Sequence, residues 1–385
     1  MATYSFATIT PEEARRFNIL DYDTLVFPSG SARQVVVQYA PQSDGFGVYR
    51  LTLGARTVEF PQAGAFFGLP AAAEAGRLRF SDGSSLFIGS DRADTFAPTG
   101  VQATRPLALY GGEGNDELSG GTRDDVLQGN QGADSLYGGE GDDLIYGGQG
   151  DDLLAGDDGA DTLQGNLGAD TLDGGAGRDV LYGGQGDDVL AGGDDADLLF
   201  GDLGADTLNG DDGDDRLTGG AGDDLLVGGR GADTLIGDQG RDLLRGGAGV
   251  DSLNGGAGDD TVEGGSGADL LRGGSGGDLF LFAPTDSTVA APDIIFDFDE
   301  DDTLDFRGLT AATPLNFRLL TPAADATVAL ARAQAALTTT TALTYVAVPV
   351  GEDIYLYVDS FGVDQAFSLV ILRDASFFSP FTAII

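Results

Sequence analysis

Histidine, cysteine and lysine are all absent from this chain, and its 20 basic residues are therefore all arginines. Without cysteine there are no disulfides and no zinc–thiolate sites. Without histidine, neither an HExxH zinc protease nor a Ser-His-Asp hydrolase can be built. An enzyme that works with two carboxylates, such as a glycosidase or a lyase, is the catalytic class that remains open.

Long apolar segments and positive charge are also scarce. No stretch approaches the roughly eighteen apolar residues of a membrane-spanning helix, so we expect no membrane span. Residues 1–20 lack the apolar core of a signal peptide. The chain carries 63 acidic residues and a formal net charge of −43, which argues against nucleic acid as a partner.

Glycine and aspartate are abundant, and they follow one strict repeat. Nineteen nonapeptides run without insertion over residues 111–281, which is 19 × 9 = 171 residues. Each reads Gly-x-x-Gly-x-Asp-x-apolar-x, usually with a second glycine at position two. Position one is always glycine, position six is always aspartate, and position eight is always apolar. A short unbroken period of this kind predicts a parallel β-solenoid.

Each position has a predicted role. Positions one to six are expected to form a tight turn, and positions seven to nine a short strand that points position eight inward. Two units then make one turn of the coil, with two parallel sheets packed through position eight. Position two is Asn or Asp at residues 130, 157, 166, 202, 211 and 238, the types that best tolerate left-handed backbone. Position four departs from glycine at Arg123 and Asp195.

The charge of the repeats requires a counterion. Residues 111–281 hold 39 acidic residues and 7 arginines, a net charge of −32. Stacked aspartates at strand spacing repel one another, and a thin core does not offset the backbone entropy of glycine-rich loops, about 1–2 kcal/mol per residue. Calcium takes six to eight oxygen ligands and matches this donor set better than magnesium, which demands tight octahedral geometry.

The repeat block resembles the calcium-binding β-roll of the RTX family of secreted proteins of Gram-negative bacteria. The resemblance implies calcium between each loop and the next loop on the same side, held by position-six carboxylates and loop carbonyls. Nineteen loops then give 19 − 2 = 17 full sites, so that about 17 Ca²⁺ bring the block from −32 to about +2. Without calcium, the acidic tract is expected to be disordered. The predicted carboxylate ligands are Asp116, Asp125, Asp134, Asp143, Asp152, Asp161, Asp170, Asp179, Asp188, Asp197, Asp206, Asp215, Asp224, Asp233, Asp242, Asp251, Asp260, Asp269 and Asp278. The predicted carbonyl ligands are Gly111, Gly120, Gly129, Gly138, Gly147, Gly156, Gly165, Gly174 and Gly183.

The expected all-β chain has three parts: an N-terminal β domain over 1–107, the β-roll over 108–281, and a C-terminal cap over 282–385. Strands are expected at 24–27, 34–39, 48–53, 57–60, 78–80 and 86–88, with a short helix at 11–16 and a degenerate repeat at 89–96. The C-terminal region resembles the cap of serralysin-type metalloproteases at 286–293, 296–306 and 355–359, although no protease domain is present. Residues 297–308 mimic the start of an EF-hand loop but fail at its later positions, so we expect a solvated acidic turn there.

These features predict a secreted, calcium-dependent structural protein at the cell surface, assembling with its own copies into a surface layer or filament. The resemblance also implies export by a type I secretion system that reads a C-terminal signal, and residues 374–385 are similar in kind to such signals. A calcium-dependent adhesin or biofilm matrix protein, with cell-surface polysaccharide as a candidate partner, is one alternative. An accessory or diverged relative of an RTX enzyme is the other. The outward positions of the even-numbered units form an apolar ledge, open to contact with the chain itself or with another copy: Val126, Leu144, Tyr146, Val180, Tyr182, Leu198 and Phe200.

Overall fold

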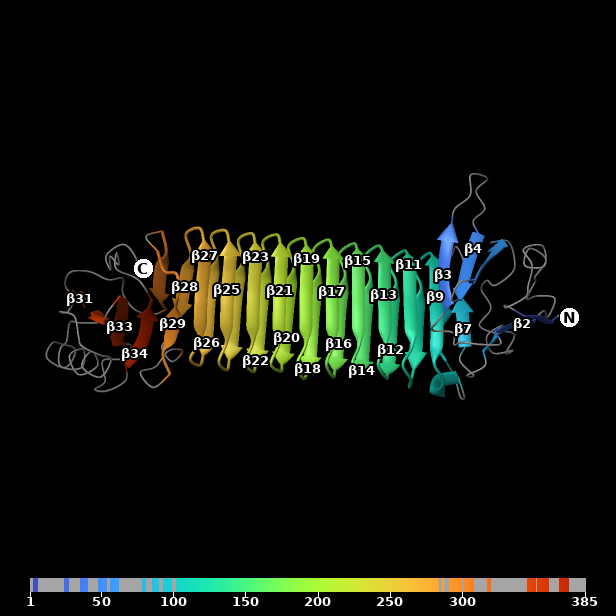
Figure 1. The fold of residues 1–385 in the computed structure, drawn as a ribbon, viewed down its shortest axis with the longest axis horizontal. Coiled ribbons are helices and arrows are strands. Elements are labelled where there is room, and N and C mark those ends of the chain that lie inside the picture. Colours follow the sequence, from blue (N-terminus) through green and yellow to red (C-terminus); the bar gives the residue numbers. More distant parts are fainter. Residues whose placement is uncertain are drawn as a thin grey trace. The chain divides into compact units, whose positions relative to one another are not determined.

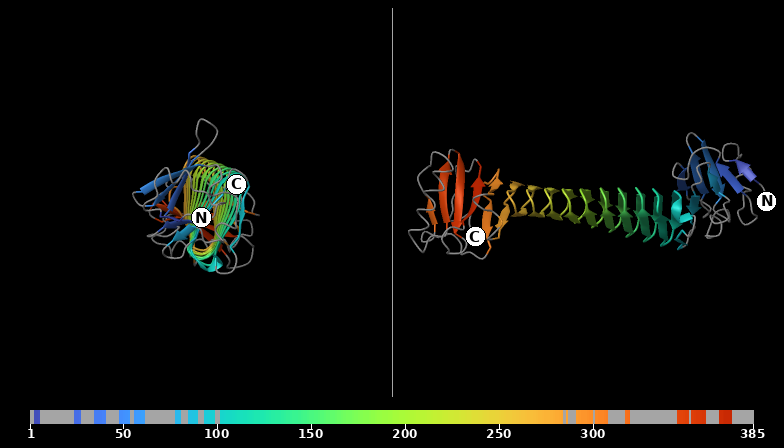
Figure 2. Two further views of the ribbon diagram at one scale, coloured as in Figure 1. Left: turned by 90° about the vertical axis from the view of Figure 1, so that its right-hand side faces the viewer. Right: turned by 90° about the horizontal axis from the view of Figure 1, so that it is seen from below.

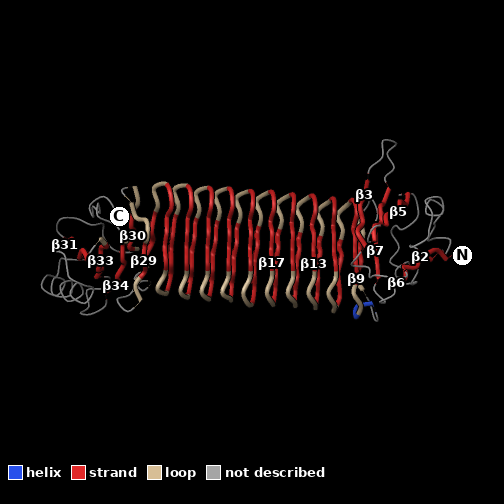
Figure 3. Tube along the Cα trace, viewed as in Figure 1, coloured by secondary structure: helices blue, strands red, loops and turns tan. Residues whose placement is uncertain are grey.

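The computed structural model describes residues 85–89, 93–98, 102–283, 286, 291–299, 301–307, 317–319, 345–350, 352–359 and 367–373, together with strands between residues 3 and 80. Its contacts divide the chain into two compact units, Met1–Val189 and Leu190–Ile385, which we describe separately. Nearly all described residues with regular structure are in strands, as the all-β prediction requires (Figures 1 and 3). The one helical segment among them is the 3-10 turn η3 (Gln102–Thr104).

In the first unit, two parallel sheets are built from alternate nonapeptides. One has the order β16-β14-β12-β10-β8 and the other β17-β15-β13-β11-β9-β7 (Figures 1 and 2). Consecutive strands therefore belong to opposite sheets, which confirms two nonapeptides per turn of the coil. The strands are β7 (Ser85–Ile88), β8 (Thr95–Phe96), β9 (Leu107–Glu113), β10 (Glu117–Gly121), β11 (Val126–Gln131), β12 (Ser135–Glu140), β13 (Leu144–Gln149), β14 (Leu153–Asp158), β15 (Thr162–Leu167), β16 (Thr171–Ala176) and β17 (Val180–Gln185).

The N-terminal part of this unit adds two small sheets. Strands β3, β4 and β5 form an antiparallel sheet, and β1, β2 and β6 a parallel one. The six strands predicted there are observed within about a residue of their expected ends, while the helix predicted at 11–16 lies outside the described residues. The bounds are β1 (Thr3–Ser5), β2 (Thr24–Phe27), β3 (Val35–Ala40), β4 (Val48–Leu53), β5 (Arg56–Pro61) and β6 (Leu78–Phe80).

In the second unit the same coil continues and ends in additional strands. Strand β29 pairs with β27, β30 pairs with β28, and the antiparallel set β32, β33 and β34 joins through β34 to β29. Strands β29 and β30 thus extend the two sheets beyond the last repeat. The strands are β18 (Val189–Asp194), β19 (Leu198–Leu203), β20 (Thr207–Asp212), β21 (Arg216–Ala221), β22 (Leu225–Arg230), β23 (Thr234–Gln239), β24 (Leu243–Ala248), β25 (Ser252–Ala257), β26 (Thr261–Ser266), β27 (Leu270–Ser275), β28 (Leu279–Phe282), β29 (Asp293–Ile295), β30 (Thr303–Phe306), β31 (Phe317–Leu319), β32 (Tyr345–Val350), β33 (Asp353–Asp359) and β34 (Phe367–Leu372).

Position eight forms the core, as predicted. Every position-eight side chain, from Leu118 to Phe280, is at most 1% exposed. The residue pairs stack in register from turn to turn, as Leu127 on Ile145 and Ile145 on Leu163. Each turn therefore adds two buried apolar side chains, one to each sheet, and the core is a single layer thick.

The strands are longer than predicted. A typical strand runs from position seven of one unit to position three of the next, six residues rather than three, as in β12 (Ser135–Glu140). The ladder skips position one: Tyr137 pairs with Ser119 and Gly139 with Gly121, while Gly138 between them has no such partner. Glycine at positions one and two therefore belongs to the strand, and the turn contains positions four to six only.

The backbone constraint at position two is confirmed. All six non-glycine residues there have positive φ, between 69° and 84°. At position four, Asp195 also has a positive φ, although its value of 74° is lower than the 108° to 158° of the position-four glycines with positive φ. Arg123 is not among the residues with positive φ, so its loop departs from the common geometry.

Candidate metal centre

A column of buried aspartates runs along each edge of the coil. All nineteen position-six aspartates, from Asp116 to Asp278, are at most 3% exposed. Each follows the turn at positions four and five, and in most units this turn brings the carboxylate back beside position one of the same unit. A buried carboxylate requires hydrogen-bond donors or a cation, because desolvation of an unpaired charge is costly.

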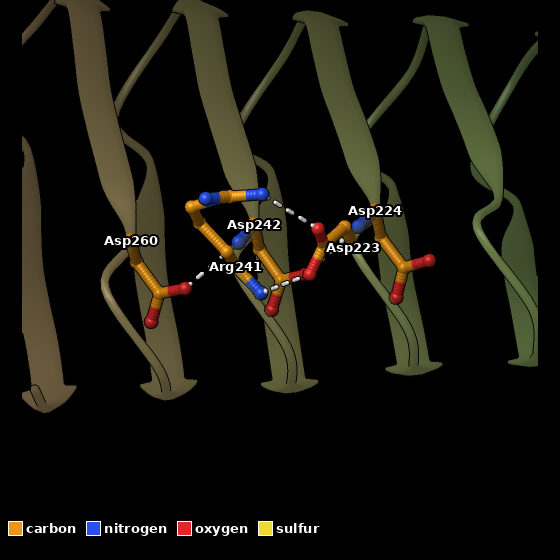
Figure 4. Close-up of polar contacts among 5 residues, drawn as sticks. All are labelled: Asp223, Asp224, Arg241, Asp242 and Asp260. Carbon is orange, nitrogen blue, oxygen red and sulfur yellow. Dashed lines mark hydrogen bonds and ion pairs between the residues drawn. The ribbon is translucent and has the colours of Figure 1, made fainter.

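One oxygen of each carboxylate links neighbouring turns. The backbone N–H of Asp224 donates to Oδ1 of Asp242 at 2.9 Å, and the N–H of Asp242 donates to Oδ1 of Asp260 at 2.8 Å (Figure 4). The same bond spans eighteen residues at most position-six aspartates of both units, for example from Asp116 to Asp134 at 2.7 Å. The carboxylate column thus ties each loop to the next loop on the same side, a role that the sequence analysis did not predict.

The other oxygen, Oδ2, is buried without a protein donor in much of the column. This holds for Asp116, Asp134, Asp152, Asp161, Asp170, Asp215, Asp224, Asp233, Asp242, Asp251, Asp260 and Asp269. Buried polar atoms of side chains normally have a partner, so a repeated orphan of one kind indicates a ligand position. A bound cation would satisfy all of these oxygens in the same way.

Position one lies against that oxygen. A Cβ built on Gly228 would meet Oδ2 of Asp233 and, at 2.6 Å, the carbonyl oxygen of Gly246 in the next loop on the same side. Glycine at position one therefore leaves a space into which a carboxylate oxygen and a carbonyl oxygen of adjacent loops both point.

Among the predicted carbonyl ligands, the carbonyls of Gly111, Gly129, Gly138, Gly147, Gly156, Gly174 and Gly183 have this placement beside a neighbouring position one. The structure does not show it for the carbonyls of Gly120 and Gly165. The prediction stopped at Gly183, yet the same placement recurs further along the chain, which the unbroken period would have indicated. The additional carbonyls belong to Gly210, Gly219, Gly228, Gly246, Gly255, Gly264 and Gly273.

Burial shifts the acidity of the column. Desolvation raises the pKa of Asp116, Asp152 and Asp161 to about 7, against the opposing effect of the backbone N–H that each accepts. Desolvation likewise raises the pKa of Asp242 and Asp260 to about 6, with neighbouring aspartates adding repulsion. When no cation is bound, these carboxyls titrate near neutral pH. A cation placed beside them favours their ionised form.

Position five forms a second, solvent-exposed ladder in the opposite direction. The N–H of Arg241 donates to Oδ1 of Asp223 at 2.9 Å, and its guanidinium forms an ion pair with Oδ2 at 2.9 Å (Figure 4). Because of these two donors, the pKa of Asp223 is lowered. Asn115 and Asp214 accept the N–H of the position-five residue of a later loop in the same way. The Asn and Asp residues at position five were the signal for this ladder.

The carboxylate column extends beyond the nineteen repeats at both ends. The N–H of Asp94 donates to Oδ1 of Asp116 at 2.7 Å, and Phe96 pairs with Leu118, so these two residues occupy the position-six and position-eight places of the degenerate repeat predicted there. At the other end, Asp293 and Asp302 accept the N–H groups of Asp269 and Asp278.

The acidic turn predicted to be solvated is therefore partly wrong. Asp302 is only 4% exposed and occupies a position-six place, and two residues later Leu304 occupies a position-eight place against Phe280. Asp297 accepts the N–H groups of Gly273 and Gly274 at 3.2 and 3.1 Å. The nine-residue spacing of Asp293-x-Ile295 and Asp302-x-Leu304 was the available signal.

The donor set is entirely oxygen. Within the described residues, no cluster of three or more acidic, histidine or cysteine side chains could hold a metal by side chains alone. The arrangement instead offers a carboxylate oxygen of one loop with a backbone carbonyl oxygen of the next loop on the same side, which suits a hard, flexible-coordination cation such as calcium. Among those residues, no helix has the length and apolar character to cross a membrane.

Comparison with known proteins agrees with this chemistry. The RTX calcium-binding nonapeptide repeat (4 copies) matches at residues 110–145, 119–154, 146–181, 155–190, 173–208, 191–226, 209–244 and 245–280. A search of curated proteins returned no match.

Three solved structures are similar to parts of the chain. The first is a subunit of the mannuronan C5-epimerase of Azotobacter vinelandii, with 25% identity over 44% of this chain and 90% of that one, at a TM-score of 0.20. A second subunit of that enzyme has 26% identity over 43% and 80%, at 0.18. The extracellular lipase LipA of Serratia marcescens has 19% identity over 67% and 40%, at 0.19. Superpositions this poor leave the assignment to the repeat sequence itself, and residues 110–280 are RTX calcium-binding nonapeptide repeats.

Proposed function

We propose that this RTX repeat protein is a secreted structural protein whose coil folds around calcium, with the position-six aspartates and the position-one carbonyls as ligands. The observation that carries the proposal is the repeated orphan Oδ2, buried beside a carbonyl oxygen of the next loop. RTX repeats bind calcium and are typical of secreted proteins. Metal binding and folding are then one process, since the sites exist only in the coiled chain.

About 17 ions are proposed for the nineteen repeats, one between each loop and the next on the same side. They would bring residues 111–281 from −32 to about +2. Asp94, Asp293 and Asp302 extend the same hydrogen-bonded column beyond the nineteen repeats. They are candidates for binding further ions at its ends.

A structural role is favoured over catalysis. The chain has no histidine or cysteine, and its buried carboxylates already serve as hydrogen-bond acceptors within the coil. The lipase and the epimerase named above are enzymes, so an accessory or diverged relative of an RTX enzyme is the second candidate. A calcium-dependent adhesin or biofilm matrix protein is the third.

Assembly with other copies, after export by a type I secretion system, is the remaining part of the proposal. Support comes from the predicted ledge, whose side chains remain partly accessible: Leu144, Tyr146, Val180 and Tyr182 are half-buried in the first unit, and Leu198 is 39% exposed in the second. Val126 departs from this pattern because it is only 9% exposed. Outward apolar side chains in a row favour contact with another surface.

Negative-stain microscopy of the purified chain, in calcium and after chelation with EGTA, tests this role. Sheets or filaments that appear with calcium and disappear with EGTA are expected, and magnesium at the same concentration should not replace calcium. Calcium-loaded protein that stays monomeric at all concentrations would favour the adhesin or enzyme alternatives. Circular dichroism unchanged by EGTA would remove calcium-driven folding itself.

A further inference from the structure

A hollow of about 620 Å³ lies on the surface of the first unit, across strands β9, β11, β13 and β15. Its volume is within the range of ligand sites in proteins. Planar polar and aromatic side chains dominate the lining, which contains one acidic residue, Glu113, and no basic residue. The side chains that matter for the argument are Gln128, Asn130, Gln131, Tyr146, Gln149 and Asn166.

The register of the strands explains the hollow. In the row of position-two residues, Gly148 stands between Asn130 and Asn166 and contributes no side chain. In the adjacent row of position-nine residues, Tyr146 stands between Gln128 and Gln164. Asn130 and Asn166 thus flank a gap that is one strand wide, and Tyr146 borders that gap.

The amides are held in place before any ligand arrives. Asn130 and Asn166 have φ of 84° and 78°, so their side chains leave the backbone from a conformation fixed by the coil. Nε2 of Gln128 donates to Oδ1 of Asn130 at 2.8 Å, and Nδ2 of Asn166 donates to the carbonyl of Gln164 at 3.1 Å. Each amide has further donor and acceptor capacity. Preorganised groups of this kind lower the entropic cost of binding.

We infer that this groove binds a neutral, extended polysaccharide that runs across the strands. A pyranose ring presents C–H groups on its faces and hydroxyls at its rim. An aromatic ring suits the faces, and amides, which donate and accept, suit the rim. The rungs are about 4.8 Å apart, close to the length of one sugar residue in an extended glycan, so successive sugars would meet equivalent positions of successive rungs.

Other ligand classes fit less well. Uronate, sulfate and phosphate groups call for arginine or lysine, and the groove has neither. Peptides add to an open sheet edge or insert apolar anchors into pockets. The strands under this groove are already paired on both sides, β11 with β9 and β13, so they offer no such edge.

The inference requires the folded repeats but not the proposed self-assembly. Isothermal titration of the full chain, in saturating calcium, would use hexasaccharides of β-linked glucan, mannan and xylan, with a hexamannuronate as the anionic comparison. Binding of at least one neutral hexasaccharide, stronger than that of the hexamannuronate, is expected. Tyr146→Ala should weaken binding roughly tenfold, on the scale of a lost aromatic contact.

The matched control is Tyr137→Ala, which removes the same residue from the same repeat position on the opposite sheet. It should leave glycan affinity unchanged. Asn130→Gly with Asn166→Gly keeps a residue that tolerates positive φ and should weaken binding at an unaltered calcium stoichiometry. The inference is overturned if no neutral glycan binds, if the hexamannuronate binds more tightly, or if Tyr137→Ala weakens binding as much as Tyr146→Ala. If the protein binds a neutral glycan but does not assemble, only the self-assembly proposal is contradicted.

Discussion

Gly237→Ala tests the proposed calcium sites with the addition of a single methyl group. Gly237 lies outside the left-handed region, so alanine is compatible with its backbone. Its Cβ, however, would come closer than 3.0 Å to Oδ2 of Asp242 and to the carbonyl oxygen of Gly255. Neither atom can easily move, because Oδ1 of Asp242 accepts the N–H of Asp224 and the carbonyl belongs to the backbone of the next loop. The methyl group thus occupies the space assigned to the ion.

The expected loss follows from linkage. With free calcium a hundredfold above the dissociation constant, one site contributes about 2.7 kcal/mol to the folded state. Alanine lowers the entropy of the unfolded chain and offsets about 0.4–1 kcal/mol of that. A net destabilisation of at least about 2 kcal/mol is therefore expected in saturating calcium, because the overlap of the methyl group with the two oxygens adds to the loss of the site. About one bound ion fewer is expected with it.

Equilibrium dialysis gives the number of bound ions, and circular dichroism during a calcium titration gives the folding midpoint. Gln239→Ala is the control, since it alters an exposed side chain two residues away in the same strand, β23. It should match the unmodified protein in both measurements. If Gly237→Ala binds as many ions with the same midpoint, the space beside position one holds no metal. If both variants lose an ion, the loop is sensitive to any change.

Four other perturbations have defined outcomes. Asp242→Asn keeps an oxygen for the N–H of Asp224 but removes a buried charge, so circular dichroism should show weaker calcium dependence and more residual structure in EDTA; less residual structure would contradict this. In calcium-free protein, burial raises the pKa of Asp116 to about 7 and that of Asp242 to about 6, from an unfolded value near 3.9. The contribution of these carboxyls to stability is therefore present at low pH and is lost as the pH rises through about 6–7. Acidification from about pH 8 to pH 5 should therefore increase β structure in EDTA, and a coil-like spectrum throughout would refute the pKa argument. Asp297→Ala removes an acceptor for two N–H groups at the last turn, a loss of about 2 kcal/mol or more, and hydrogen exchange should accelerate there but not in earlier turns; equal acceleration everywhere would indicate a global effect. Val180→Asp with Tyr182→Asp should abolish calcium-dependent assembly while calcium stoichiometry is retained; assembly that persists in the microscope would exclude this face as the contact.

Much of the coil could be predicted from the sequence because the burial of side chains and the conformation of the backbone follow the same nine-residue period. Nine residues per unit fix which side chains are buried, so Ile145 and Leu163 stack as expected. The replacement of glycine at position two by Asn130 and Asp157, and by no bulky residue, predicts positive φ, and both residues have it. Both inferences rest on local rules that the rest of the fold does not override.

The strand ends and the outer rungs could not be predicted in the same way. Glycine at positions one and two predicts a turn from its local preference, yet Gly139 and Gly121 pair with each other in the ladder between two strands. Asp293 lies 24 residues after its partner Asp269 rather than eighteen, because six residues are inserted there. A strict period detects repeats only while no insertion interrupts it, and tertiary pairing restores the register afterwards.

The two positions with an invariant residue, glycine at position one and aspartate at position six, both surround the proposed calcium site. At position six, Oδ1 holds the preceding loop on the same side through an N–H bond, while Oδ2 keeps its charge for a cation; asparagine supplies the first function and not the second. At position one, any Cβ would occupy the space between that oxygen and the next carbonyl. Positions two and four face no such double demand, and Asn166 and Asp195 satisfy them by backbone conformation alone. Substitutions thus occur at positions two and four, which shape the backbone, and not at positions one and six, which surround the proposed ion. The difference follows from the atoms that lie around Oδ2 of the position-six aspartate.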